Sequence, residues 1–130
     1  MDVYSVIGEA GFERLVAAFY RQVPDDDILG PMYPPDDMAG AEQRLRDFLV
    51  GRFGGPPRYM EQRGHPRLRM RHAPFAIDGQ ARDRWLLLMN NALDEVAFVP
   101  QVDALMREFF AQVATMLINR AEGPPSLPQH

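Results

Sequence analysis

Apolar side chains recur every three to four residues in four segments of this chain, and this spacing restricts the fold more than any other feature of the sequence. It is the spacing of one buried face of an α-helix. No segment alternates apolar and polar residues convincingly with the period of two that marks a half-buried strand. The sequence therefore predicts an all-α fold.

Proline, glycine and aspartate separate the four predicted helices. The expected boundaries are a first helix over about 12–23, a second from Asp36–Asp37 to Gly54–Gly55, a third after Asp78 and a fourth after Pro100. Residues 31–35 are too rich in proline for a regular helix, so we expect a corner there. The broadest inward-facing stripe is expected on the fourth helix and consists of Val102, Leu105, Met106, Phe109, Val113, Met116 and Leu117.

The length and composition suit one globular domain. With 130 residues, 46% of them hydrophobic and 25% charged, the chain can bury an ordinary core. We expect the domain to cover residues 1–120 and the proline-rich residues 121–130 to form a flexible tail. No apolar run approaches the roughly 18 residues needed to cross a bilayer. The N-terminus lacks a secretory signal and cysteine is absent, so we expect a cytoplasmic protein.

The chain is acidic overall but contains one basic cluster. Its formal net charge of −4 argues against nucleic acid as the main partner. All 14 basic residues are arginines, which a coding bias would explain. Coding bias does not explain why several of these arginines crowd into residues 58–71, where only Glu61 opposes them. The cluster suggests that a small anionic group binds there.

The segment between Gly54 and Asp78 does not fit an ordinary helical bundle. It is more than 20 residues long and has little periodicity, whereas connections between helices usually have about 2–8 residues. Apolar and aromatic residues are scattered through it, so its composition is not that of a disordered linker. A cofactor that replaces core side chains would keep such a segment ordered. A plain surface loop is the other interpretation, and the spacing does not decide between them.

His72 is the candidate metal ligand in that segment. If residues 66–72 form a short helix, Leu68 and His72 share one face, and Arg67 and Arg71 lie beside them in the same relation. A neutral imidazole can bind haem iron while apolar residues cover the porphyrin and guanidinium groups pair with the propionates. The alternative is a lone histidine bonded to the backbone near a helix end, which spacing alone favours. No zinc, calcium or phosphate-binding motif competes with these interpretations.

Three aromatic residues with polar ends occur at positions that we expect to face inward. Tyr20 belongs to the first helix, Tyr33 to the proline corner and Trp85 to the third helix. A buried Tyr hydroxyl or Trp N–H normally has a hydrogen-bond partner. Backbone groups would satisfy each of them singly, but three such donors together favour a polar ligand inside the core.

Six runs of residues match one known family. They are Phe19-Tyr20-Arg21-Gln22-Val23, Met32-Tyr33-Pro34, Ala41-Glu42-Gln43-Arg44-Leu45, Gly54-Gly55-Pro56, the long run from Tyr59 to Phe75, and Arg82-Asp83-Arg84-Trp85-Leu86. Over about residues 3–119 the chain resembles the group II truncated haemoglobins of bacteria. The long run, which contains His72, is the most specific. The chain departs from the family at Ile7-Gly8-Glu9 and at Arg52-Phe53, positions that concern helix ends and packing.

The resemblance implies a truncated globin fold, in which a two-over-two helical sandwich surrounds haem b and its iron. It implies that His72 is the proximal iron ligand and that Trp85, Tyr33 and Tyr20 are hydrogen-bonding residues on the distal side. Ala41 matches the position at which many globins have a distal histidine. The remaining implied haem contacts are the apolar residues Leu45, Phe48, Leu68 and Phe75, and, as candidates for the propionates, Arg44, Tyr59, Arg67 and Arg71.

By the same resemblance, we expect reversible binding of O₂ at ferrous haem, and of other diatomic ligands such as CO and NO. One alternative is a haem enzyme for nitric oxide detoxification or peroxidase-like chemistry, which would work with a partner reductase or peroxide. A second alternative is a haem-free helical interaction module, which would be colourless. Family members are often dimeric, so a homodimer is among the expectations.

Overall fold

The computed structural model describes residues 2–120, and within this range it contains helices and no strand. This confirms the all-α prediction, while the predicted tail 121–130 lies outside the described residues. The elements are α1 (Val3–Gln22), the 3₁₀ turns η1 (Gly30–Met32) and η2 (Pro35–Asp37), α2 (Met38–Arg52), α3 (Arg58–Arg63), α4 (Leu68–His72), α5 (Gly79–Val96) and α6 (Pro100–Met116). The two 3₁₀ turns form the predicted proline corner.

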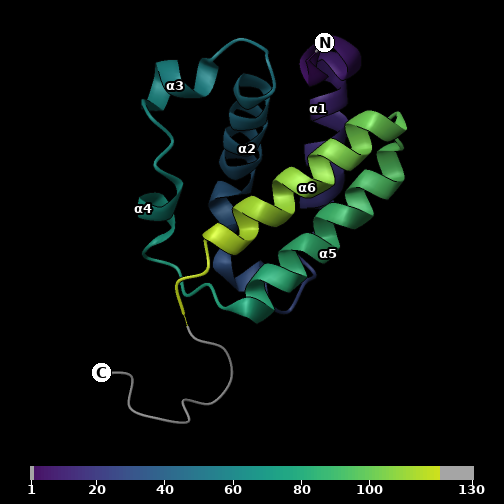
Figure 1. The fold of residues 1–130 in the computed structure, drawn as a ribbon. Coiled ribbons are helices and arrows are strands. Elements are labelled where there is room, and N and C mark those ends of the chain that lie inside the picture. Colours follow the sequence, from purple (N-terminus) through teal and green to yellow (C-terminus); the bar gives the residue numbers. More distant parts are fainter. Residues whose placement is uncertain (1, 121–130) are drawn as a thin grey trace.

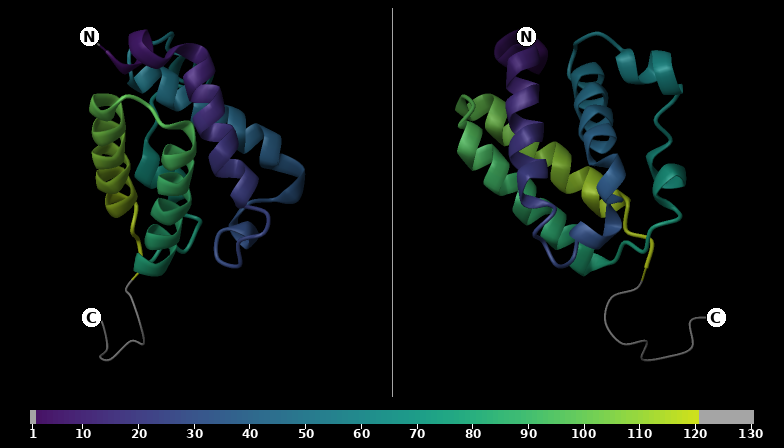
Figure 2. Two further views of the ribbon diagram at one scale, coloured as in Figure 1. Left: turned by 90° about the vertical axis from the view of Figure 1, so that its right-hand side faces the viewer. Right: turned by 180° about the vertical axis from the view of Figure 1, so that it is seen from behind.

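The four long helices form two crossed layers. Helix α1 packs against α2 and α5, and α5 packs against α6. Figures 1 and 2 show α5 and α6 as an antiparallel pair that crosses the pair formed by α1 and α2. This is the two-over-two arrangement that the resemblance implies. Its largest fully buried side chains are Phe12, Phe19, Leu15, Leu49, Met89, Leu93, Met106, Val16, Val23 and Val50.

Helix α1 begins nine residues earlier than the apolar spacing predicts. Asp2 caps it by accepting a hydrogen bond from the backbone N–H of Ser5 at 2.8 Å. Gly8 then interrupts the helical geometry with a φ of 66°, a left-handed value that glycine adopts at little cost. The predicted start near Phe12 was therefore wrong, because the interruption at Gly8 breaks the periodicity of the first turns.

Helices α5 and α6 begin where the sequence predicts. The side chain of Asp78 caps α5 by accepting from the Ala81 N–H at 2.8 Å, and Pro100 is the first residue of α6. The predicted stripe on α6 was too wide, since Leu105 and Met116 are 49% and 40% exposed. The buried face is the narrower i, i+4 row Val102, Met106, Phe110 and Ala114.

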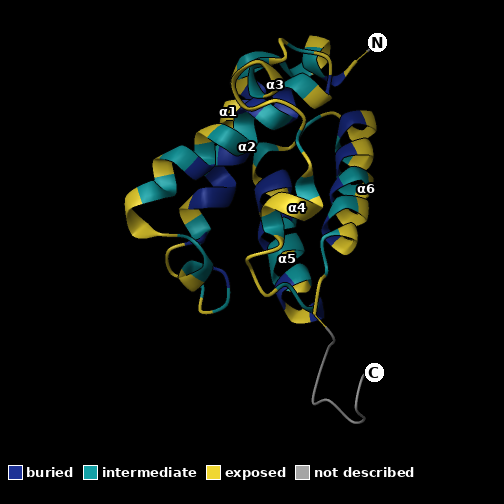
Figure 3. Cartoon of the chain, turned by 90° about the vertical axis from the view of Figure 1, so that its left-hand side faces the viewer, coloured by how far each residue is buried: buried dark blue, intermediate teal, exposed yellow. Residues whose placement is uncertain are grey.

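The segment between α2 and α5 is ordered but only partly packed. It contains α3 and α4, and Figure 3 shows α4 as mainly exposed in comparison with the dark core of the long helices. Arg58 at the start of α3 bonds to Glu9 of α1 at 2.6 and 2.9 Å. At the other end, the side-chain amide of Asn119 donates to the carbonyls of His72 and Phe75 at 3.3 and 3.0 Å. Within residues 2–120, no helix has both the length and the apolar character needed to cross a membrane.

Candidate functional site

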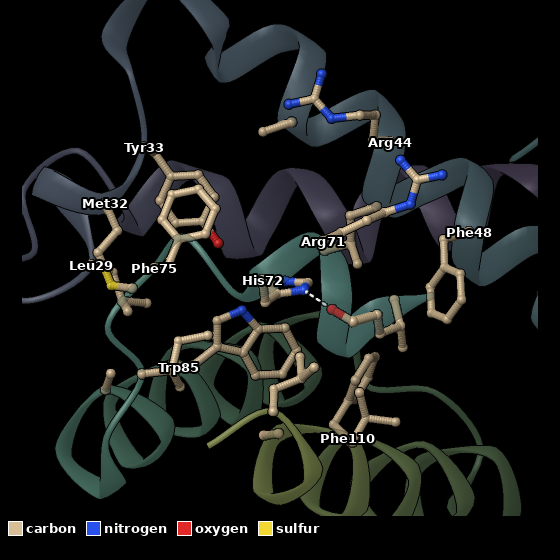
Figure 4. A pocket seen from close by; sticks show the side chains of 18 of the residues that line it. Leu29, Met32, Tyr33, Arg44, Phe48, Arg71, His72, Phe75, Trp85 and Phe110 are labelled. Atoms are coloured by element: carbon tan, nitrogen blue, oxygen red, sulfur yellow. Dashed lines mark hydrogen bonds between the residues drawn. The ribbon is translucent and has the colours of Figure 1, made fainter. Parts of the chain in front are cut away.

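A cavity of about 540 Å³ lies between this segment and the long helices. The volume falls within the range of about 300–1,000 Å³ that is typical of small-molecule and cofactor sites. Its lining includes these residues singled out from the sequence: Tyr20, Tyr33, Ala41, Arg44, Leu45, Phe48, Tyr59, Leu68, Arg71, His72, Phe75 and Trp85. Residues that lie up to 65 positions apart in the chain thus meet around one space (Figure 4).

The ring of His72 is oriented by the turn of helix that precedes it. Its Nδ1 lies 2.7 Å from the carbonyl oxygen of Leu68, four residues earlier. A carbonyl can only accept, so Nδ1 carries the proton and Nε2 keeps the lone pair that can bind a metal. The backbone-bonded histidine and the metal ligand, which were alternatives in the sequence, are therefore compatible. A hydrogen bond of this kind is the usual support of a metal-binding imidazole.

Three hydrogen-bond donors converge on the side of the cavity formed by α1, the corner and α5. The rings of Tyr20 and Tyr33 are 5.6 Å apart, and Phe19 contacts both Tyr20 and Trp85 at 5.0 and 5.1 Å between ring centroids. Burial raises the pKa of Tyr33, while hydrogen bonding with Tyr20 and Trp85 acts in the opposite direction. Burial also raises the pKa of Tyr20 strongly. Both hydroxyls are therefore protonated at neutral pH and able to donate.

The walls between these polar groups are apolar. Ala41, Leu45 and Phe48 come from α2, and Figure 4 shows the rings of Phe48, Trp85 and Phe110 around the imidazole of His72. The aromatic walls of α5 and α6 touch, since Trp85 and Phe110 are 5.5 Å apart between ring centroids. A flat apolar cofactor would replace water against these surfaces, and this replacement favours its binding.

Arginines line the cavity alongside a single carboxylate. Arg44 bonds to Asp37 at 2.6 Å, and this contact lowers the pKa of Asp37. Arg71 lies 5.8 Å from the ring centroid of Tyr59 and donates to backbone carbonyls of the α3–α4 connection. Figure 4 shows both guanidinium groups on the side of the cavity opposite to Trp85 and Phe110. Arg67 is exposed and lies outside the lining, so the geometry gives no support to the contact that the resemblance implies for it.

The sequence did not single out several residues that line the cavity. They are Leu29, Met32, Pro34, Asp37, Leu49, Arg63, Ile77, Ala81, Arg82, Phe109, Phe110, Val113, Ala114 and Leu117. Phe109 and Val113 of α6, and Leu117 directly after it, belong to the predicted apolar stripe, so the sequence marked them as inward-facing but indicated a packed core. Nothing local distinguishes a residue that faces a cofactor from one that faces another helix.

The donor set fits a cofactor that brings most of its own metal ligands. Among residues 2–120 there is no group of three or more His, Cys, Asp or Glu side chains that could hold a bare metal ion. The cavity instead offers one imidazole, apolar walls and arginines. Haem supplies four nitrogen ligands, a flat apolar ring and two carboxylates, and so it matches each of these features.

Comparison with known proteins decides the family. A family model described as bacterial-like globin matches residues 2–119. The chain belongs to the bacterial-like globin family. Relatives of this globin include the group 2 truncated haemoglobin of Bacillus subtilis, which is 34% identical over 92% of this chain and 89% of its own length. The resemblance to group II truncated haemoglobins is thereby confirmed.

Solved structures agree with this assignment. This globin superposes on the group II truncated haemoglobin of Bacillus anthracis with a TM-score of 0.90 and 32% identity, over 98% of each chain. For a thermostable haemoglobin from Thermobifida fusca the TM-score is 0.88 and the identity 44%, over 92% of this chain and 98% of the other. Membership in the family implies that this globin binds haem.

Proposed function

We propose that this globin binds O₂ reversibly at a haem b whose iron is held by His72, and that it takes CO and NO at the same position. The observation that carries the proposal is the meeting of one oriented imidazole and three aromatic hydrogen-bond donors in a single cavity of about 540 Å³. When bound, haem supplies the iron that takes a diatomic ligand. The side chains described below determine how firmly that ligand is held.

His72 supports the proposal through the tautomer that its hydrogen bond selects. The Leu68 carbonyl keeps the proton on Nδ1, so that Nε2 is available without any rearrangement of the ring. The arginines supply the complementary charge at the edge of the cavity. Arg44 and Arg71 line it from α2 and α4, where each can pair with a propionate.

The distal donors support O₂ as the ligand. Electron density shifts onto O₂ when it binds ferrous haem, and preorganised donors in a dry cavity stabilise that charge. Ala41 has no hydrogen-bonding side chain, so this role falls to Trp85, Tyr33 and Tyr20. Trp85 is the principal donor in our proposal, because an indole N–H cannot present a repelling lone pair.

The visible absorption spectrum of the purified, haem-supplemented chain tests the proposal. We expect one haem per chain and a ferrous spectrum that changes under O₂ and returns when the gas is replaced by nitrogen. A colourless protein would contradict the haem site and favour an interaction module. A haem protein that oxidises at every exposure to O₂, yet turns over NO or peroxide with a reductant, would contradict reversible binding and favour an enzyme.

A further inference from the structure

An ion pair outside the cavity lining joins two of the segments that line it. Arg84 Nη1 on α5 donates to Asp26 Oδ1 at 2.5 Å and to Asp27 Oδ1 at 2.8 Å. The side chain of Asp26 is 8% exposed, whereas that of Asp27 is 84% exposed. Arg84 therefore makes one shielded contact and one surface contact with neighbouring carboxylates.

The second carboxylate oxygen of Asp26 binds the backbone just before η1. Asp26 Oδ2 accepts from the backbone N–H groups of Ile28 at 3.1 Å and Leu29 at 2.7 Å. The backbone carbonyl of Asp26 accepts from the Gly30 N–H at 2.9 Å, and the Gly30 carbonyl accepts from the Tyr33 N–H at 3.2 Å. Leu29 and Tyr33 both line the cavity. A chain of hydrogen bonds thus runs from the Asp26 carboxylate to the backbone of Tyr33.

On the other side of the pair, Arg84 directly precedes Trp85 in α5. Within residues 2–120, the ion pairs that join residues 23–37, the segment between α1 and α2, to α5 both end on Arg84. Tyr33 is also joined directly to Trp85 by the hydrogen bonding that lowers the pKa of Tyr33, and their rings are linked further through Tyr20 and Phe19. The ion pair is therefore a second, charged link, outside the cavity lining, between the segments that carry these two donors.

We propose that Asp26 and Arg84 are positioning residues, which hold Tyr33 and Trp85 in register and so determine how strongly the cavity holds a diatomic ligand. The inference rests on the proposed function. Its physical basis is that a preorganised donor stabilises a ligand only if the residues that support the donor hold it in place, because a small displacement of the donor weakens its hydrogen bond. Asp26 contacts both segments at once, and burial makes its contact with Arg84 less subject to screening than a surface pair.

Asp26→Asn is the test, with Asp27→Asn as the matched control. Both changes remove one negative charge beside Arg84, but only Asp26 also binds the corner backbone. Asparagine keeps an oxygen for the Leu29 N–H, so the corner can still form. We expect O₂ to dissociate about three- to tenfold faster from the ferrous, haem-loaded Asp26→Asn variant than from the parent. This factor corresponds to the loss of part of one hydrogen bond between a distal donor and the ligand. The control should stay within twofold.

A double-mutant cycle with Trp85→Phe separates positioning from a general loss of stability. If Asp26 acts through Trp85, adding Asp26→Asn to Trp85→Phe should change the dissociation rate by less than twofold. The C–O stretching frequency of the CO complex should move in the same direction in both single variants and stay unchanged in Asp27→Asn. Full additivity of the two changes would overturn the inference. Arg84→Met should also speed O₂ dissociation, and Arg84→Lys, which keeps the positive charge, should bring the rate part of the way back to that of the parent.

Amide hydrogen exchange gives a readout that does not require ligand binding. The Leu29 N–H should exchange faster in Asp26→Asn than in Asp27→Asn, with and without haem. If the parent chain failed to bind haem or to bind O₂ reversibly, the proposed function would fail, whereas an unchanged O₂ dissociation rate in Trp85→Phe would only move the main donor role to the tyrosines. If Trp85→Phe raised that rate but Asp26→Asn behaved like Asp27→Asn, only the positioning role would fail.

Discussion

At the scale of single residues, the helix that carries His72 orients its ring for the proposed role as iron ligand. Because Leu68 holds Nδ1 at 2.7 Å, no energy is spent in turning the ring when the cofactor arrives. His72→Ala should therefore lose haem or hold it weakly, as measured by the ratio of Soret to protein absorbance after gel filtration. His65→Ala is the control, since His65 is exposed and lies outside the cavity lining. The opposite pattern would refute the proximal role of His72.

Trp85 is the residue whose removal should affect the diatomic ligand most. A hydrogen bond to a partly charged acceptor contributes about 1.5–3 kcal/mol. Trp85→Phe keeps an aromatic wall but removes the N–H, so O₂ dissociation should become roughly ten- to a hundredfold faster in stopped-flow measurements. Tyr33→Phe should have a smaller effect, because Tyr20 lines the same cavity with its ring 5.6 Å from that of Tyr33 and offers a second hydroxyl. A rate within twofold of the parent in Trp85→Phe would move the main role to the tyrosines.

At the scale of elements, the α3–α4 connection depends on side-chain hydrogen bonds more than on packing. Arg71 Nε donates to the Pro66 carbonyl at 2.7 Å, and Arg71 Nη2 donates to the Arg63 carbonyl at 2.9 Å. Arg71→Met would free these carbonyls and also remove a charge from the cavity edge. Net hydrogen-bond contributions of about 0.5–1.5 kcal/mol imply haem loss about two- to tenfold faster, measured by transfer to a haem scavenger.

Arg67→Met is the matched control for that experiment. Arg67 directly precedes α4, the helix that contains Arg71, and carries the same charge, but it is exposed and lies outside the cavity lining. Its removal should change the rate of haem loss by less than twofold. Equal effects of the two variants would show that net charge, rather than the bonds of Arg71, holds the cofactor.

The contact between α1 and α3 should make stability depend on pH. Hydrogen bonding with Arg58 holds the pKa of Glu9 below its usual value, despite an opposing effect of burial. A carboxylate whose folded pKa is depressed stabilises the fold above its unfolded pKa of about 4.3 and loses this contribution as the pH falls through the folded pKa. Glu9→Gln should cost about 1 kcal/mol or less at pH 7, because the pair is partly exposed.

Urea unfolding at several pH values measures this contribution. The difference in unfolding free energy between the parent and Glu9→Gln should be largest near pH 7 and should shrink toward zero below about pH 4. Glu13→Gln, an exposed change on the same helix, should show little difference at any pH. A difference that grew on acidification would mean that Glu9 is not stabilised as a carboxylate.

At the scale of the whole molecule, the cavity leaves the core incomplete without its cofactor. The apolar side chains around this cavity of about 540 Å³ would gain van der Waals contacts with haem. Haem that binds only the folded chain adds stability in proportion to the logarithm of its excess over Kd, about 4 kcal/mol at a thousandfold excess. We expect the melting temperature, followed by circular dichroism, to rise on the order of 10 °C with haem. His72→Ala should lose most of this increase, and an equal increase in that variant would mean that haem binds elsewhere.

Local signals in the sequence determined most of the helices, and the resemblance of one contiguous run pointed to His72 as the candidate proximal ligand. The cap at Asp78 and the proline at position 100 act on neighbouring backbone groups, so their effect can be read without the fold. The run of residues around His72 likewise depends on a contiguous segment. The start of α1 was the local error, since the left-handed glycine at position 8 hides the first two turns from any count of periodicity.

Only the tertiary structure decided which side chains share the cavity and which polar groups act on one another. Leu105 and Phe109 lie four residues apart in the predicted stripe of α6, yet the first is exposed and the second lines the cavity, because helix crossing determines which part of a stripe is covered. The contact of Asp26 with Arg84 joins residues 58 positions apart. No local pattern encodes such a pair, since its energy comes from burial and geometry that exist only once the two layers have packed.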